Sequence, residues 1–278
     1  MQEVCYLNGT IVPLTEARVS VLDLGMLRSF GIYEGITAVN GEPFHFDDHF
    51  ERFARSAGAL GLTLTIGLEE ACEAARKVVA HNAPGKGRAS IRMLLTGGTA
   101  LGGLEHVPGR ETFYIWATPA DVLPANLYEE GGSLIMREHQ RFMPGSKTTN
   151  YITAVILQPE RKEAGAIEVL YVSGSQVLEC ATSNIFIVKD GTVITPAENI
   201  LQGITRKVTL ALARETYPVE ERDITVTEVF AADECFITSS FKDIVPIVSI
   251  DGRQIGTGSP GPITCDLITR YAIEMGRA

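Results

Sequence analysis

The sequence has few basic residues and no long apolar run. Its 278 residues include 24 Lys and Arg against 34 Asp and Glu, which gives a formal net charge of −10. A protein that binds a nucleic-acid backbone needs a basic footprint, so this charge argues against a nucleic-acid partner. No apolar stretch approaches the ~20 residues of a membrane span, and the first residues do not resemble a secretory signal. We therefore expect a cytoplasmic protein without a membrane partner.

Cysteine and histidine are scarce, and their spacing has no pattern typical of a site. The five cysteines are scattered and never spaced as CxxC, so we expect reduced thiols rather than a disulfide framework. The five histidines show neither HExxH nor HxH spacing, which argues against a metal site. Apolar residues make up 45% of the chain, enough for a packed core.

Three two-residue turns predict β-hairpins. Asn40-Gly41, Asp190-Gly191 and Asp251-Gly252 each separate two apolar runs, and such pairs readily adopt the positive φ angles of a type I′ turn. Apolar spacing predicts helices over 47–62 and 68–81, and at about 150–164, 203–216 and 262–276. Because hairpins dominate and strict strand–helix alternation is missing, we expect an α+β protein.

A stretch rich in proline and glycine, residues 117–132, indicates a domain boundary. We predict an N-terminal domain over 1–118, a linker over 119–132 and a C-terminal domain over 133–278. In two-domain proteins the ligand site commonly lies between the domains.

Lys147 differs from the other six lysines, which lie in helical charge patterns, beside turns or near Asp243. Its neighbours, from Met143 to Tyr151, are small or uncharged and lead into a helical pattern. A lysine in this setting can be approached closely by a planar ligand and can act as a Schiff-base nucleophile. The alternative is a loop lysine in water.

Six segments occur in an order that resembles the class IV, or fold-type IV, pyridoxal-phosphate enzymes. These include D-amino-acid aminotransferases, branched-chain aminotransferases and aminodeoxychorismate lyase. The segments are 30–35, 49–57, 147–151, 178–186, 201–206 and 236–246. The resemblance implies the D-amino-acid aminotransferase fold, with pyridoxal 5′-phosphate between a smaller N-terminal and a larger C-terminal domain, and a homodimer.

The resemblance also implies a role for each matching residue. Lys147 forms the Schiff base and moves the substrate proton, while Glu179 pairs with the pyridine nitrogen. Arg52 binds the phosphate, and Tyr151 binds the phenolic oxygen; the alternative for Arg52 is a solvated helical arginine paired with Asp48 or Glu51. For Glu179 the alternative is a surface residue at the start of a loop. The full cofactor-binding set is Arg52, Lys147, Tyr151, Glu179, Gly203, Ile204, Thr205, Ser239 and Ser240.

Three residues are candidates for binding the substrate carboxylate. Tyr33 matches the tyrosine of D-amino-acid aminotransferases, and Arg28 and Arg92 each interrupt an apolar run. Arginines can clamp a carboxylate in bidentate fashion, and the alternative for both is a structural ion pair. We expect transfer from a D-amino acid, such as D-alanine or D-glutamate, to a 2-oxo acid such as 2-oxoglutarate or pyruvate. An L-branched-chain aminotransferase and then aminodeoxychorismate lyase are the alternatives.

One motif indicates a different class of enzyme. Ser239 and Lys242 fit the SxxK pattern of acyltransferases that use a serine nucleophile, but the SDN and KTG elements are missing. A Ser/Lys acyltransferase is therefore the alternative from another class. Lys242 is also where the chain departs from the class IV pattern.

Overall fold

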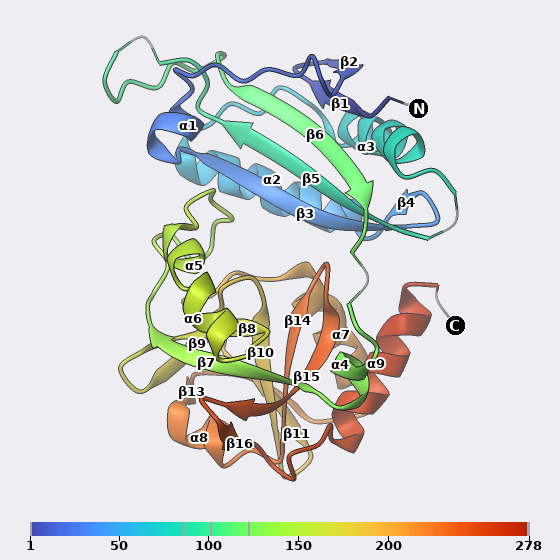
Figure 1. Cartoon of the computed structure of the whole chain (residues 1–278), viewed down its shortest axis with the longest axis vertical. Coiled ribbons are helices and arrows are strands. Elements are labelled where there is room, and N and C mark those ends of the chain that lie inside the picture. The colour runs from blue at the N-terminus through green and yellow to red at the C-terminus, as the bar shows by residue number, and fades with distance from the viewer. Residues whose placement is uncertain (1, 86, 101, 122, 277–278) are drawn as a thin grey trace. The chain divides into compact units, whose positions relative to one another are not determined.

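The computed structural model describes residues 2–276 except 86, 101 and 122 (Figure 1). Its contacts divide the chain into two units, Met1–Asp121 with Ser146–Tyr151, and Val122–Gly145 with Ile152–Ala278. The segment that carries Lys147 is thus grouped with the N-terminal unit, although it lies within the predicted C-terminal domain. The predicted linker includes residue 122, which lies outside the described residues, and its bounds stay a prediction.

The first unit is an antiparallel sheet with two long helices on one face (Figure 1). The strand order is β2-β1-β6-β5-β3-β4. The strands are β1 (Val4–Leu7), β2 (Thr10–Pro13), β3 (Gly31–Val39), β4 (Glu42–Pro43), β5 (Arg88–Thr96) and β6 (Thr112–Pro119), and the helices are α1 (Leu24–Arg28), α2 (Phe46–Leu60) and α3 (Leu68–Asn82).

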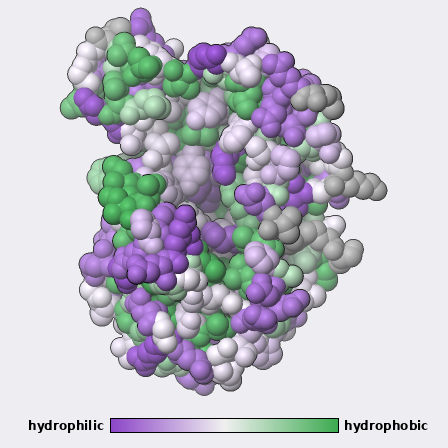
Figure 2. All heavy atoms as spheres, viewed as in Figure 1, coloured by the Kyte–Doolittle hydropathy of each residue, from purple (hydrophilic) through white to green (hydrophobic). Residues whose placement is uncertain are grey.

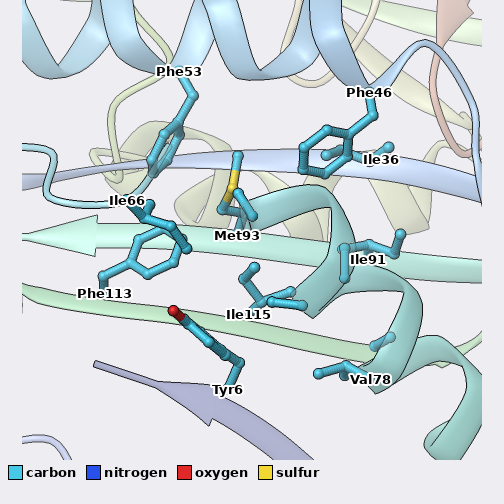
Figure 3. Packing of buried hydrophobic residues seen from close by; sticks show 14 of the residues in the cluster. Tyr6, Ile36, Phe46, Phe53, Ile66, Val78, Ile91, Met93, Phe113 and Ile115 are labelled. Carbon is cyan, nitrogen blue, oxygen red and sulfur yellow. The ribbon is translucent and has the colours of Figure 1, made fainter. Parts of the chain in front are cut away.

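The core of this unit lies between the sheet and helices α2 and α3. Ile36, Met93 and Ile115 extend from three neighbouring strands and pack with Phe53 and Val78 of the helices (Figure 3). Side chains alternate between the two faces of a strand, so the residues between these core positions face away from the helices. That outer face carries Tyr33 and Gly35 of β3, Arg92 of β5 and Trp116 of β6.

The second unit is built on a mixed sheet, ordered β12-β11-β10-β14-β15-β7-β8-β9-β13, with β16 paired to β15. β7 runs parallel to β8 and β15, and β11 runs parallel to β12. The strands are β7 (Gly132–Glu138), β8 (Glu168–Ser173), β9 (Gln176–Cys180), β10 (Asn184–Lys189), β11 (Thr192–Thr195), β12 (Val219–Glu221), β13 (Ile224–Thr225), β14 (Glu234–Ser239), β15 (Asp243–Ile250) and β16 (Arg253–Gln254). The helices are α4 (Asn126–Glu129), α5 (Ile152–Ile156), α6 (Gln158–Glu163), α7 (Ile204–Arg214), α8 (Val226–Phe230) and α9 (Pro262–Glu274).

All three predicted hairpins are confirmed. They are β3–β4, β10–β11 and β15–β16, and both residues of each turn have positive φ, such as 51° at Asn40 and 90° at Gly41. The predicted helix at 150–164 is instead two helices, α5 and α6. Pro159 lies in the first turn of α6, where its missing N–H has no helical partner to lose. Among the described residues no helix has the length and apolar character needed to cross a membrane.

Candidate active site

The segment around Lys147 is held against the beginning of β3 by backbone hydrogen bonds. Tyr33 N donates to Lys147 O at 2.9 Å, and Thr149 N donates to Gly31 O at 2.9 Å. On the other side, Lys147 N donates to Ser56 Oγ of α2 at 3.2 Å. The lysine backbone is therefore fixed from two sides, which limits where its side chain can go.

The Lys147 side chain lies over an aromatic ring. Its Nζ is 4.4 Å from the ring centroid of Tyr33, a cation–π distance. Tyr33 OH donates to Tyr151 OH at 2.7 Å, and the two rings meet edge to face at 5.5 Å. The structure therefore brings together three predicted site residues, and Lys147 is not a loop lysine in open water.

Arg52 lies in a buried ion cluster with Glu34 and His49. Its Nε and Nη2 donate to the two Glu34 carboxylate oxygens at 2.8 and 2.7 Å, and His49 Nδ1 lies 2.8 Å from Glu34 Oε2. Burial raises the pKa of Glu34, but the charge and hydrogen bonds of Arg52 and His49 outweigh it and lower that pKa to about 2. The alternative of a solvated Arg52 is wrong, because only 4% of it is exposed. Glu34 was missed, although an acid between the apolar residues of a strand was a signal.

Glu179 is the central residue of the site in the second unit. It is buried, and its two oxygens accept from Arg141 Nε at 2.8 Å and Leu201 N at 3.0 Å. Arg141 Nη2 also donates to Pro144 O at 2.5 Å, so one guanidinium holds both the carboxylate and the chain that leads to Lys147. The alternative of a surface Glu179 is wrong. The role of Arg141 is not predictable from the sequence, since nothing in it shows that an arginine 38 residues away reaches Glu179.

Gly203 is the N-cap of helix α7, and a side chain at this position would clash with Asn184. A Cβ there would lie 2.1 Å from Asn184 Oδ1, and the Asn184 side chain is itself fixed by donating to Leu201 O at 2.8 Å. Within the described part of the chain, no side-chain hydrogen bond caps the N-terminus of this helix of 11 residues. The first-turn amides of Ile204 and Thr205 are therefore oriented for an anion, and the helix dipole favours one.

Two hydroxyls beside this helix end lack partners. Thr238 Oγ1 and Ser239 Oγ, at the end of β14, are buried with no hydrogen-bond partner among the described residues. Thr238 is directly paired with Asn184, and Ser240 follows in the turn to β15. Helix amides and hydroxyls together suit a phosphate, and a buried carboxylate suits a protonated ring nitrogen. This donor set fits pyridoxal phosphate.

The three predicted substrate residues lie in different settings within the first unit. Tyr33 and Arg92 lie on the outer face of the sheet, where Arg92 is directly opposite Gly35 on one side and Trp116 on the other. Trp116 Nε1, which the sequence analysis did not consider, is buried without a hydrogen-bond partner in the described part of the chain. Arg28 is exposed at the end of α1, and its Nη1 donates to the backbone oxygen of Leu27.

The acyltransferase alternative is wrong, because it requires Lys242 to activate Ser239. Lys242 Nζ bonds to Glu168, Thr182 and Ser183, at 2.9, 2.8 and 3.4 Å, rather than activating Ser239. A serine nucleophile needs an adjacent base, and none of the described residues hydrogen-bonds Ser239 Oγ.

Comparisons with known proteins agree on one family. A model of the amino-transferase class IV family matches residues 31–250. A D-alanine aminotransferase of Listeria monocytogenes is 32% identical over 98% of this chain and 96% of its own length. A putative branched-chain-amino-acid aminotransferase of Methanocaldococcus jannaschii is 34% identical over 96% of this chain and 94% of its own.

Solved structures give the same result. The branched-chain aminotransferase of Thermoproteus uzoniensis, crystallised with norvaline, superposes with a TM-score of 0.89 at 31% identity, covering 100% of this chain and 96% of that one. The branched-chain amino acid aminotransferase of Thermobaculum terrenum, in its PLP form, gives 0.86 at 28% identity and covers 100% of this chain and 95% of that one. The expected fold, cofactor and class of enzyme are confirmed. The chain belongs to the class IV aminotransferases, which use pyridoxal phosphate to transfer amino groups.

Proposed function

We propose that this aminotransferase takes the amino group from D-amino acids, D-alanine and D-glutamate first, and passes it to 2-oxoglutarate or pyruvate. The cluster of Lys147, Tyr33 and Tyr151 carries the proposal, because it combines an amine with two hydroxyls at the start of β3. The similarity to a D-alanine aminotransferase over nearly the whole chain supports the choice of enantiomer.

The proposed cofactor residues divide the work by chemistry. Bound pyridoxal phosphate supplies an electron sink for the bond that breaks at the substrate α-carbon. Glu179 keeps the ring nitrogen protonated, and Tyr151 binds the phenolic oxygen. Arg52 is the proposed phosphate contact of the first unit. The proposed phosphate donors of the second unit are the amides behind Gly203, the Thr205 hydroxyl, Ser239 and Ser240.

Lys147 has two tasks in this proposal. It would hold the cofactor covalently, and its Nζ, once released by a substrate amine, would move the proton between the substrate α-carbon and C4′ of the cofactor. The backbone bonds to Tyr33 and Ser56 keep the amine in place during both steps. The Tyr33 ring, whose centroid lies 4.4 Å from Nζ, limits where the amine can move.

Arg92 is the proposed main contact of the substrate carboxylate, with Tyr33 beside it. Gly35, directly opposite Arg92, adds no side chain to that face of the sheet, and the Trp116 N–H is a further donor. Arg28 is exposed, so we propose that it takes part only when a second subunit is present.

We also propose a homodimer that works in the cytoplasm. Among the described residues, several exposed large apolar side chains are grouped in two segments: Val21, Leu22, Met26 and Leu27 in and before α1, and Ile152, Val155 and Ile156 on α5. Figure 2 shows apolar side chains gathered over α5. Exposed apolar patches of this kind mark interaction surfaces, and sedimentation of the purified protein tests the assembly.

Half-reactions with single substrates test the enantiomer. We expect D-alanine and D-glutamate to change the absorbance spectrum of the bound cofactor rapidly. L-leucine should change this spectrum far more slowly. The second candidate is an L-branched-chain aminotransferase, favoured by the relative from Methanocaldococcus jannaschii. Fast conversion by L-leucine alone would establish that candidate and reject ours.

A further inference from the structure

Lys242 lies in the turn between β14 and β15, immediately after the hydroxyls of Ser239 and Ser240. Its ammonium group bonds to Glu168 Oε2 at 2.9 Å and to Thr182 Oγ1 at 2.8 Å. Its backbone oxygen accepts from Tyr128 OH at 3.0 Å. Both ends of this lysine are thus fixed, which is unusual for a flexible side chain in a surface turn.

The partner of Lys242 is a buried acid at the start of β8. Only 4% of Glu168 is exposed, and its Oε2 also accepts from Thr182 Oγ1 at 2.7 Å and Ser183 Oγ at 2.8 Å. Burial raises the pKa of Glu168, but the charge of Lys242 and these hydrogen bonds lower it overall, so the acid is ionised near neutral pH.

The cluster of Lys242, Glu168, Thr182 and Ser183 connects two turns that carry proposed cofactor residues. Thr182 and Ser183 form the turn between Glu179 at the end of β9 and Asn184 at the start of β10. Asn184 in turn packs against Gly203, where the helix amides begin. Lys242 belongs to the other turn, beside Ser240.

We infer that Lys242 is a positioning residue for cofactor binding: through Glu168 it holds the Ser239–Ser240 turn at a fixed place relative to the turn behind Glu179. This inference rests on the proposed roles of Ser240 and Glu179. Preorganised donors bind a phosphate more tightly than mobile ones, because ordering a mobile turn on binding costs free energy. Loss of Lys242 therefore weakens binding of pyridoxal phosphate without removing any group that touches it.

The test titrates the apoenzyme with pyridoxal phosphate and compares Lys242→Met with Lys242→Arg. We expect Lys242→Met to weaken cofactor affinity about tenfold, the effect of about one hydrogen bond, while kcat at saturating cofactor changes less than about threefold. Lys242→Arg restores the ion pair and most of the affinity. Lys189→Met is the matched control, because it removes an exposed ion pair with Asp233 in the same unit and leaves the affinity unchanged.

The following results separate a role of Lys242 in cofactor binding from a purely structural role. If Lys242→Met lowers the melting temperature but binds the cofactor as the wild type does, the cluster is only structural and the inference is overturned. Should this variant not fold, Lys242→Met with Glu168→Gln removes both charges, and the same affinity criterion applies to it. Ser240→Ala separates the proposals: if it leaves the affinity unchanged, the proposed role of Ser240 fails.

A double-mutant cycle then tests the coupling directly. If Lys242 acts through Ser240, the variant with Lys242→Met and Ser240→Ala loses less affinity than the product of the two single losses. Independent, multiplicative losses would show that Lys242 does not act through Ser240. Loss in Ser240→Ala alone, with full affinity in Lys242→Met, refutes the inference while leaving the proposed function intact.

Discussion

Glu34→Gln removes the buried charge that holds Arg52. In the folded protein the pKa of Glu34 falls from its usual 4.5 to about 2, which corresponds to about 3 kcal/mol of stability at neutral pH. No discount for solvent screening applies, because Glu34 has no exposed surface. The same order follows from removing one partner of a buried ion pair, about 3–5 kcal/mol, because the other charge is left unpaired.

The pH dependence has a defined sign. A lowered folded-state pKa gives stability that is fully present above the unfolded value of about 4.5 and is lost as the pH falls towards 2. The difference between wild type and Glu34→Gln is therefore largest near neutral pH. It shrinks as the pH falls below about 4.5.

Urea unfolding, followed by tryptophan fluorescence, measures the difference in unfolding free energy between wild type and Glu34→Gln in the first unit. The chain has one tryptophan, Trp116 in β6, so its signal reports on the sheet that carries Glu34. Glu42→Gln is the matched control, since it breaks the exposed ion pair with Arg76 and costs at most about 1 kcal/mol. A loss below about 1 kcal/mol for Glu34→Gln at neutral pH, or an equal loss at neutral pH and near pH 3, refutes the reasoning.

Two further predictions concern single residues, and a third concerns the cysteines. Lys147→Ala keeps the circular dichroism of the wild type but abolishes turnover, because it removes the amine that lies over Tyr33; normal activity in this variant would remove Lys147 from the mechanism. Arg52→Lys keeps a charge beside Glu34 but loses the planar fork, so we expect cofactor affinity to fall roughly 10- to 100-fold in a titration, and an unchanged affinity contradicts a phosphate contact. Burial raises the pKa of the Cys180 and Cys235 thiols, so a thiol reagent near pH 8 should modify the exposed Cys265 and leave those two unmodified until urea unfolds the chain.

Local sequence signals predicted the parts of the fold that short-range chemistry decides. The three turn pairs predicted the hairpins because Asn or Asp followed by Gly tolerates positive φ at both positions. The short helices α1, α4 and α8 were not predicted, since four or five residues show no helical period. Helix α1 does have a local signal, an Asp23 side chain that caps Gly25 N, but tertiary contacts decide whether so short a helix forms.

The candidate site was predictable where it depends on a motif and not where it depends on long-range pairing. Lys147, Glu179 and Gly203 each stand in a segment with a recognisable order of residues. No short sequence pattern predicts the pairing of Glu34, Arg141 or Glu168. Their partners lie 18, 38 and 74 residues away in the sequence, respectively. Composition alone also could not show that Arg52 is buried, since half of an amphipathic helix is exposed and an arginine fits either side.

The buried acids Glu34 and Glu168 are best explained by the geometry that they impose. Removing a charge from water costs about as much as a buried ion pair returns, so neither the Glu34–Arg52 pair nor the Glu168–Lys242 pair adds much net stability over an apolar pair. Each acid, however, accepts several hydrogen bonds at once, and its cation can then adopt only one position. Arg52 is itself a proposed phosphate contact. Lys242 holds the turn that carries Ser240, another proposed phosphate contact. On these proposals, Glu34 orients a group that binds the phosphate, and Glu168 holds Lys242 and so the turn that carries Ser240. A carboxylate outside the set of cofactor contacts would then contribute to cofactor affinity in each unit.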